Sequence, residues 1–131
     1  MRGRVEIRQF IERKPKKASP YRTRFMMLSQ EGLEELQERL ADRTLGIQAM
    51  RVLVAMMQSL DYENRVDPPQ KEIAFRLGMS VQEVYKASKT LIECGFIERM
   101  ANRRGWYRVS PRLCWKGSVA NLEKELAKAA V

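Results

Sequence analysis

The sequence contains no histidine and only two cysteines among its 131 residues. Cys94 and Cys114 do not form a CxxC pair, and without histidine the common sets of zinc ligands cannot be completed. We therefore expect no metal site and no cofactor. We interpret both cysteines as reduced, partly buried residues of a cytosolic protein. A disulfide between them is the alternative that the sequence leaves open.

Long apolar runs are also missing. No stretch approaches the roughly 18 apolar residues that a membrane-spanning helix needs. The charged stretch at residues 1–17 lacks the apolar centre of a secretory signal. With 44% hydrophobic and 31% charged residues, the composition fits a soluble globular protein with one core. These features predict a cytoplasmic protein that does not bind membranes.

Sequence motifs of the common catalytic sites are absent as well. The chain has no nucleophile elbow and no phosphate-binding loop. Five acidic residues between residues 30 and 43 fit a solvated helix face better than an acid–base pair, because nothing nearby would orient them. We therefore predict that the protein is not an enzyme.

The net charge of +9 is unevenly distributed. Residues 1–24 carry nine basic and two acidic residues, a net +7, and the segment "KPKKASP" favours an extended chain. Residues 25–60 carry −2, and residues 61–131 carry +4. We predict a basic, largely extended arm at residues 1–24 and one domain at residues 25–131. The charge favours a polyanionic partner, although a solubilising tail is the alternative for the arm.

Two amphipathic helices are predicted at the start of the domain. Ser29 is a good N-cap for a helix over residues 30–42, in which Gly32 should weaken the first turn. Residues 44–60 form the most apolar helix, with hydrophobic side chains at spacings of three and four, and should supply the core. A short strand fits residues 64–66.

The next stretch, "QKEIAFRLGMSVQEVYKASKTLIECGFIER", predicts two helices joined by a tight turn. The first runs from residue 69 to residue 77, and Gly78 suits a left-handed residue at the turn. Ser80 and Glu83 have the spacing of a capping box, which starts the second helix at residues 81–94.

After residue 95 the hydrophobic period changes from 3.6 to 2. Residues 96–100 and 106–110 predict two strands that flank the short basic tip "ANRRG". Residues 111–118 should then leave this sheet. A last amphipathic helix is expected at residues 119–130, with an apolar stripe formed by Val119, Leu122, Leu126 and Ala130.

Together these elements predict a mainly α fold with a small β-wing, a winged helix-turn-helix with extra N- and C-terminal helices. In this arrangement the second helix of the pair enters the major groove of DNA. Its outward side would contain Gln82, Tyr85, Lys86 and Lys89. Glutamine pairs with adenine edges, lysine with guanine or phosphate, and tyrosine with phosphate or sugar.

Further DNA contacts are expected beside this helix. Ser80 and the amides at the helix start suit a phosphate, and the wing suits the adjacent backbone or minor groove. The basic residues of the wing are Arg99, Arg103, Arg104 and Arg108. A solvated helix face and an ordinary polar hairpin tip are the alternatives for these side chains. The aromatic residues Trp106, Tyr107 and Trp115 are interpreted as packing residues.

The segment from Phe25 to Ser118 resembles the RepL-type plasmid replication proteins, a winged-helix family of initiators. The resemblance rests on "MQSLDYENRV", on the helix pair quoted above and on the exit segment "GWYRVSPRLCWKGS". Ser110 stands where that family usually has asparagine before the proline. The resemblance implies recognition of a replication origin and recruitment of host replication proteins, without catalysis by this chain.

Three functions therefore stand at this point. The first is sequence-specific binding of double-stranded DNA at the origin of a plasmid, phage or related mobile element. The second is a transcriptional regulator with the same fold, and the third is a winged helix that docks proteins. The basic helix face favours DNA over protein. We also expect a homodimer, because winged-helix proteins often read two half-sites, with the helices at residues 30–42 and 119–130 as candidate surfaces.

Overall fold

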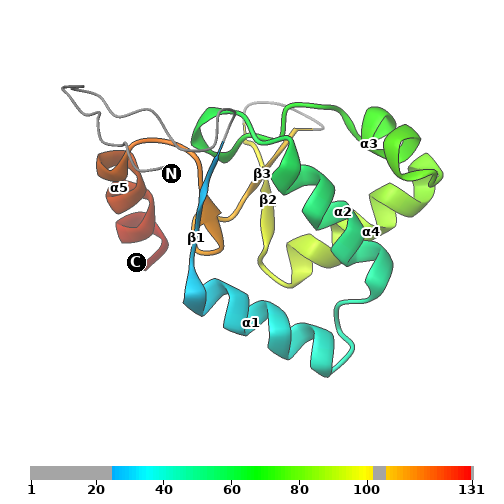
Figure 1. Cartoon of the computed structure of the whole chain (residues 1–131), viewed down its shortest axis with the longest axis horizontal. Coiled ribbons are helices and arrows are strands. Elements are labelled where there is room, and N and C mark those ends of the chain that lie inside the picture. The colour runs from blue at the N-terminus through cyan, green and yellow to red at the C-terminus, as the bar shows by residue number, and fades with distance from the viewer. Residues whose placement is uncertain (1–24, 102–105, 131) are drawn as a thin grey trace, which may run out of the picture.

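The computed structural model describes residues 25–101 and 106–130, and this part is mainly helical with two small antiparallel sheets (Figure 1). The predicted arm and the hairpin tip at residues 102–105 lie outside the described residues. The helices and the β2–β3 hairpin follow an order consistent with a winged-helix layout. In chain order the elements are β1 (Met27–Leu28), α1 (Gln30–Ala41), α2 (Ile47–Gln58), the 3-10 helix η1 (Tyr62–Asn64), α3 (Gln70–Leu77), α4 (Val81–Glu93), β2 (Ile97–Arg99), β3 (Tyr107–Val109), β4 (Cys114–Trp115) and α5 (Val119–Ala130).

Helix α2 forms the centre of the core, as its apolar spacing predicted. Its buried residues are Ala49, Val52, Leu53, Ala55 and Met56, and α3 and α4 pack against it. The helix begins at Ile47, three residues later than expected. The reason lies in the preceding turn, where the amide and the hydroxyl of Thr44 donate to Asp42 Oδ1 at 3.0 and 2.7 Å. These hydrogen bonds lower the pKa of Asp42.

The turn between α3 and α4 has the predicted geometry. Gly78 adopts a left-handed conformation with φ 66°, which glycine reaches without steric cost. The Ser80 hydroxyl accepts a hydrogen bond from the Glu83 amide at 3.1 Å, and the Glu83 carboxylate accepts one from the Ser80 amide at 2.8 Å. The capping box is therefore confirmed, and it fixes where α4 begins.

The β2–β3 hairpin is also confirmed. Ile97 pairs with Val109, and Arg99 pairs with Tyr107 next to the tip. A third segment joins the other side of β3, because Arg65 bridges to Arg108 and the Val66 amide donates to the Tyr107 carbonyl at 3.0 Å. Strand β3 is thereby held against residues 65–66 on the side that does not pair with β2.

Residues 62–64 form a 3-10 turn, so only Arg65 and Val66 keep part of the expected strand at residues 64–66. Asn64 has a left-handed φ of 64° and is completely buried, with 0% of its surface exposed. Its amide nitrogen donates to the carbonyls of Val109 at 2.8 Å and Cys114 at 2.7 Å. Its oxygen accepts from the Lys116 amide at 2.8 Å. Asn64 thus joins β3 to β4.

The segment after the hairpin pairs with the start of the domain in a second sheet, and this pairing is what the sequence did not predict. Met27 pairs with Trp115 and Leu28 with Cys114, so β4 lies beside β1 from the start of the domain (Figure 1). The Ser29 amide extends this pairing by donating to the Leu113 carbonyl at 2.9 Å. The start of α1 is therefore tied to residues more than eighty positions away.

Both cysteines are free, as predicted. Cys94 is half-buried at the end of α4, and Cys114 is buried in β4. Burial raises the pKa of Cys114 to about 12, which keeps the thiol protonated and unreactive near neutral pH.

Gly32 lies where α1 crosses the segment before β4. A Cβ atom at this position would lie 2.6 Å from the Arg112 carbonyl oxygen and 2.8 Å from the Leu113 Cα. The close approach of this segment therefore requires glycine at position 32. The sequence had indicated only that Gly32 weakens the first turn of the helix.

We expect Gly32→Ala to lower the free energy of unfolding by about 1–3 kcal/mol, because the backbone of the neighbouring segment must move. This loss should exceed the gain in helix propensity of roughly 1 kcal/mol. Urea denaturation measures the difference. The matched control is Gly46→Ala, where a Cβ would meet nothing within 4 Å; because Gly46 is the N-cap of α2, this variant should lose only the cap preference, less than about 1 kcal/mol. Equal stability of the two variants would contradict the close approach.

Helix α5 packs on its own domain at the end of the molecule away from α3 (Figure 1). Ser118 caps it by accepting from the Asn121 amide at 3.2 Å, and the Trp115 indole donates to the Ser118 carbonyl at 2.9 Å. The predicted apolar stripe is only partly buried: Leu122 is half-buried, but Val119 is 59% exposed. The side chain of Ala130 lies outside the described residues.

Candidate nucleic-acid interface

Helix α4 has one buried and one exposed side. The buried side consists of Val84, Ala87, Ser88 and Leu91, which face the core. The exposed side contains all four side chains that the sequence assigned to base reading, namely Gln82, Tyr85, Lys86 and Lys89. The structure therefore brings these four residues together on one accessible helix face, with an amide, a hydroxyl and two ammonium groups.

Ser80 lies at the start of the same helix, but its polar groups are already used. Its hydroxyl accepts from the Glu83 amide, and its own amide donates to the Glu83 carboxylate. The structure therefore shows a capping role for Ser80. A phosphate at this position would have to share the site with the Glu83 carboxylate, so the phosphate contact of Ser80 stays a prediction.

The arginines of the hairpin differ in their surroundings. Arg99 is exposed on β2, beside the tip. Arg103 and Arg104 lie in the tip, outside the described residues. Arg108 on β3 is half-buried, and its guanidinium lies 2.8 Å from Glu125 of α5 and 3.6 Å from Glu98. The hydrogen bond from Arg108 lowers the pKa of Glu125. The charge of Arg108 is thus used within the domain, and its DNA contact stays a prediction.

The packing aromatics were largely assigned correctly. Tyr107 and Trp115 are buried, whereas Trp106 is partly exposed beside the tip. Sequence reasoning missed Gln70, whose side chain contacts both α4 and the hairpin. Polar residues are common in the first turn of a helix, so nothing in the sequence distinguishes Gln70 at the start of α3.

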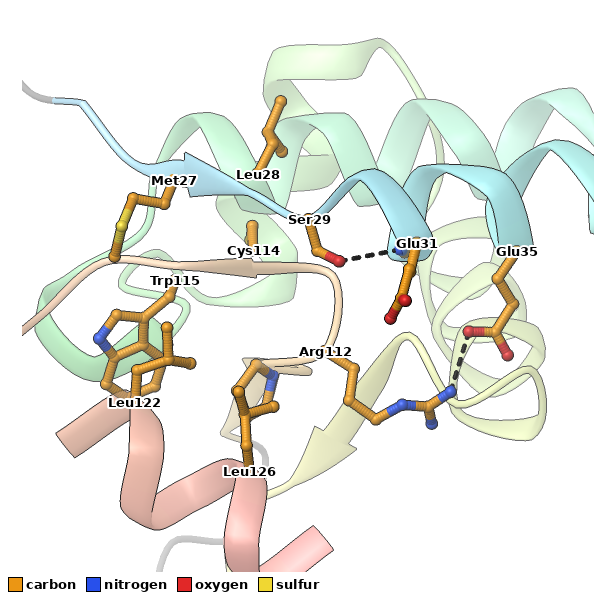
Figure 2. Close-up of a pocket in the computed structure, with 12 residues that line it drawn as sticks. Met27, Leu28, Ser29, Glu31, Glu35, Arg112, Cys114, Trp115, Leu122 and Leu126 are labelled. Carbon is orange, nitrogen blue, oxygen red and sulfur yellow. Dashed lines mark hydrogen bonds and ion pairs between the residues drawn. The ribbon is translucent and has the colours of Figure 1, made fainter. Parts of the chain in front are cut away.

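A groove of about 350 Å³ lies on another part of the domain, between β1 and α1 on one side and α5 on the other (Figure 2). Figure 2 shows Met27, Trp115, Leu122 and Leu126 around it, and an ion pair at its rim joins Arg112 to Glu35 at 3.0 Å. None of the four base-reading candidates on α4 lines this groove.

Other kinds of site find little support among residues 25–101 and 106–130. No group of three or more acidic or cysteine residues there could hold a metal ion. In the same part of the chain, no helix is long and apolar enough to cross a membrane.

The comparisons with known proteins address the family. The model of the RepL family, described as Firmicute plasmid replication protein, matches residues 39–128, which is more than half of the chain. The chain belongs to the RepL family. The RepL match extends from the end of α1 into α5, so it includes the helix pair, the hairpin and the exposed face of α4. It confirms the resemblance, although it begins and ends later than residues 25–118. No curated protein and no solved structure matches this RepL chain.

Proposed function

We propose that this RepL protein is a winged helix-turn-helix protein that binds double-stranded DNA at a specific sequence in the replication origin of a plasmid or related mobile element. The observation that carries the proposal is the exposed face of α4, which presents Gln82, Tyr85, Lys86 and Lys89 while its opposite side holds the core. Membership of a plasmid replication family supports replication over transcription as the process served.

In this proposal α4 lies in the major groove. Gln82 and the two lysines read base edges, and Tyr85 contacts the sugar–phosphate backbone. The wing, with Arg99 beside its tip, lies along the neighbouring backbone. Phosphate contacts from the wing and from the basic arm supply much of the affinity, which should therefore fall steeply with salt concentration.

The chain carries no chemistry of its own in this proposal. It marks the origin and brings host replication proteins to it. We also propose that it binds as a homodimer, because two copies can read two half-sites one helical turn apart. The exposed apolar residues Leu33 of α1 and Leu126 of α5 make these helices candidate dimer surfaces. Sedimentation that shows a monomer both free and on the full site would contradict the dimer.

The test of the proposed function is an unbiased selection of bound fragments from the genome and the episomes of the host, followed by footprinting. We expect protection confined to an origin, and loss of episome replication without a change in transcription when the protein is removed. Fragments from promoters would instead support a transcriptional regulator. Failure to bind any duplex at low salt would favour a protein-docking role.

The wing gives a separate prediction. Replacing Arg103 and Arg104 together with alanine should weaken binding to specific and random duplexes alike, because phosphate contacts do not depend on sequence. The slope of log affinity against log salt should fall by roughly 1–2, since about one counterion is released per phosphate contact. Binding titrations at several salt concentrations measure both effects. A selective loss of affinity for the specific site would show that the tip reads bases.

A further inference from the structure

We propose that Gln70 is a positioning residue that fixes the angle between the recognition helix α4 and the β2–β3 hairpin. Its side-chain nitrogen donates to Ser88 Oγ of α4 at 3.1 Å and to the Tyr107 hydroxyl of β3 at 3.1 Å. One amide group on α3 thus bridges the two elements that the proposed function assigns to base reading and to phosphate contact. The inference rests on that function for its effect on DNA.

The bridge is well defined because its acceptors are fixed. Ser88 and Tyr107 are both buried, and the Ser88 hydroxyl donates its own hydrogen to the Val84 carbonyl at 2.9 Å. The oxygen of Ser88 is therefore available to Gln70 only as an acceptor. An amide nitrogen has two hydrogens, and Gln70 has one acceptor for each. Both donors of Gln70 are used in the bridge.

The position of the bridge explains why it would matter. Ser88 lies on the inner side of the turn of α4 whose outer side carries Tyr85 and Lys89. Tyr107 is the first residue of β3 after the tip and pairs with Arg99. The bridge therefore connects the buried side of α4, opposite the face proposed to read the DNA, to the end of β3 that adjoins the hairpin tip.

A second attachment between α4 and the hairpin lies at the far end of the helix. There the chain passes directly into β2 through Gly95, which has a φ of 83°. This joint is hydrogen-bonded to the helix, because the Gly95 amide donates to the Ile92 carbonyl and the Phe96 amide to the Leu91 carbonyl, both at 3.0 Å. The Gln70 bridge adds a directional contact at the other end of the hairpin, where Tyr107 pairs with Arg99 next to the tip.

The first test uses Gln70→Met, which keeps the length of the side chain and removes both donors. We expect the affinity for the selected origin fragment to fall about tenfold, because α4, once fixed in register by its base contacts, no longer places the wing on its phosphates. On a random duplex no base contacts fix the position of α4, so the wing can still reach a phosphate, and the affinity should change less than about twofold. Hydroxyl-radical footprints should keep the central protection from α4 and lose the flanking protection from the wing. The matched control is Gln58→Met on α2, an exposed glutamine outside the interface, which should change neither affinity.

The second test needs no DNA. The Met100 amide donates to the Trp106 carbonyl at 3.0 Å at the base of the tip. We expect hydrogen exchange of this amide to become several-fold faster in Gln70→Met, while exchange in α2 stays unchanged. Tyr107→Phe, which removes only the hydroxyl that accepts from Gln70, should show the same changes to a smaller degree. If Gln70→Met does not fold, Tyr107→Phe alone tests the positioning role.

The outcomes separate the two proposals. A wild-type protein without preference for any sequence contradicts the proposed function, and the exchange measurement then tests the bridge alone. A wild-type protein that prefers its origin, with an unchanged preference in Gln70→Met and Tyr107→Phe, overturns the positioning role. An equal loss of specific and random binding together with a lower melting temperature shows that Gln70 only stabilises the fold, and it overturns the inference as well.

Discussion

Replacing Asn64 with leucine is expected to lower the free energy of unfolding by about 3–5 kcal/mol, because two buried carbonyls and one partly buried amide lose their hydrogen-bonding partner. The groups are the carbonyls of Val109 and Cys114 and the amide of Lys116. All three contacts are between 2.7 and 2.8 Å, and no surface of Asn64 is exposed from which water could replace them. Leucine at this position must also adopt the left-handed φ of 64°, which is less favourable for leucine than for asparagine.

The matched variant is Asn64→Gly, which tolerates the left-handed backbone but still lacks the amide. Its loss of stability should be smaller than that of leucine by roughly 1–2 kcal/mol, the cost of a left-handed conformation for a side chain with a Cβ. Urea denaturation at neutral pH measures all three proteins. A leucine variant that unfolds within about 1 kcal/mol of the wild type would contradict the role of Asn64 as a buried link.

Local features of the structure could be predicted from the sequence because their signals are local. Ser80 and Glu83 stand three residues apart and form the capping box, and Gly78 occupies the left-handed turn that its sequence context indicated. The exposed face of α4 follows from the spacing of its apolar residues alone. The same holds for the alternating pattern of β2 and β3.

Contacts between distant residues could not be predicted in this way. The side chain of Asn64 bonds residues 45 and 50 positions away, and nothing near it in the sequence distinguishes it from a loop asparagine. The pairing of β1 with β4 involves strands of two residues each, which are too short for a recognisable alternation. Gly32 was interpreted as a weak point because the segment that passes beside it is known only from the fold.

Arg108 shows the same limit within the candidate interface. In the sequence it is one more cation of a basic hairpin. In the structure Glu125 of α5 lies 2.8 Å from it, and 17 residues separate the two in the chain. The charge of a residue can be read from a sequence, but the residue that pairs with it cannot. Exposed cations such as Lys86 and Lys89 are accessible to a polyanion, whereas the charge of Arg108 is balanced within the domain.

Reversing both charges on α4, with Lys86→Glu and Lys89→Glu, is expected to reduce the affinity for the origin fragment at least about a hundredfold. Each lysine contact to a base or phosphate is worth about 1–3 kcal/mol, and the new carboxylates are repelled by the phosphates. Both side chains are exposed, so the melting temperature should stay close to that of the wild type. Titration of a labelled origin duplex at fixed salt measures the loss.

The control changes the net charge by the same amount elsewhere. Lys124→Glu with Lys128→Glu places two carboxylates on exposed positions of α5, at the end of the molecule away from α3. Because Lys128 lies 3.3 Å from Glu125, the partner of Arg108, Lys124→Glu alone is measured beside it to separate any effect through that pair. Because charges beyond a Debye length of roughly 10 Å are screened, the double variant on α5 should lose only a few-fold in affinity. If both double variants lost affinity equally, binding would depend on total charge alone, and α4 would not be the helix that reads the DNA.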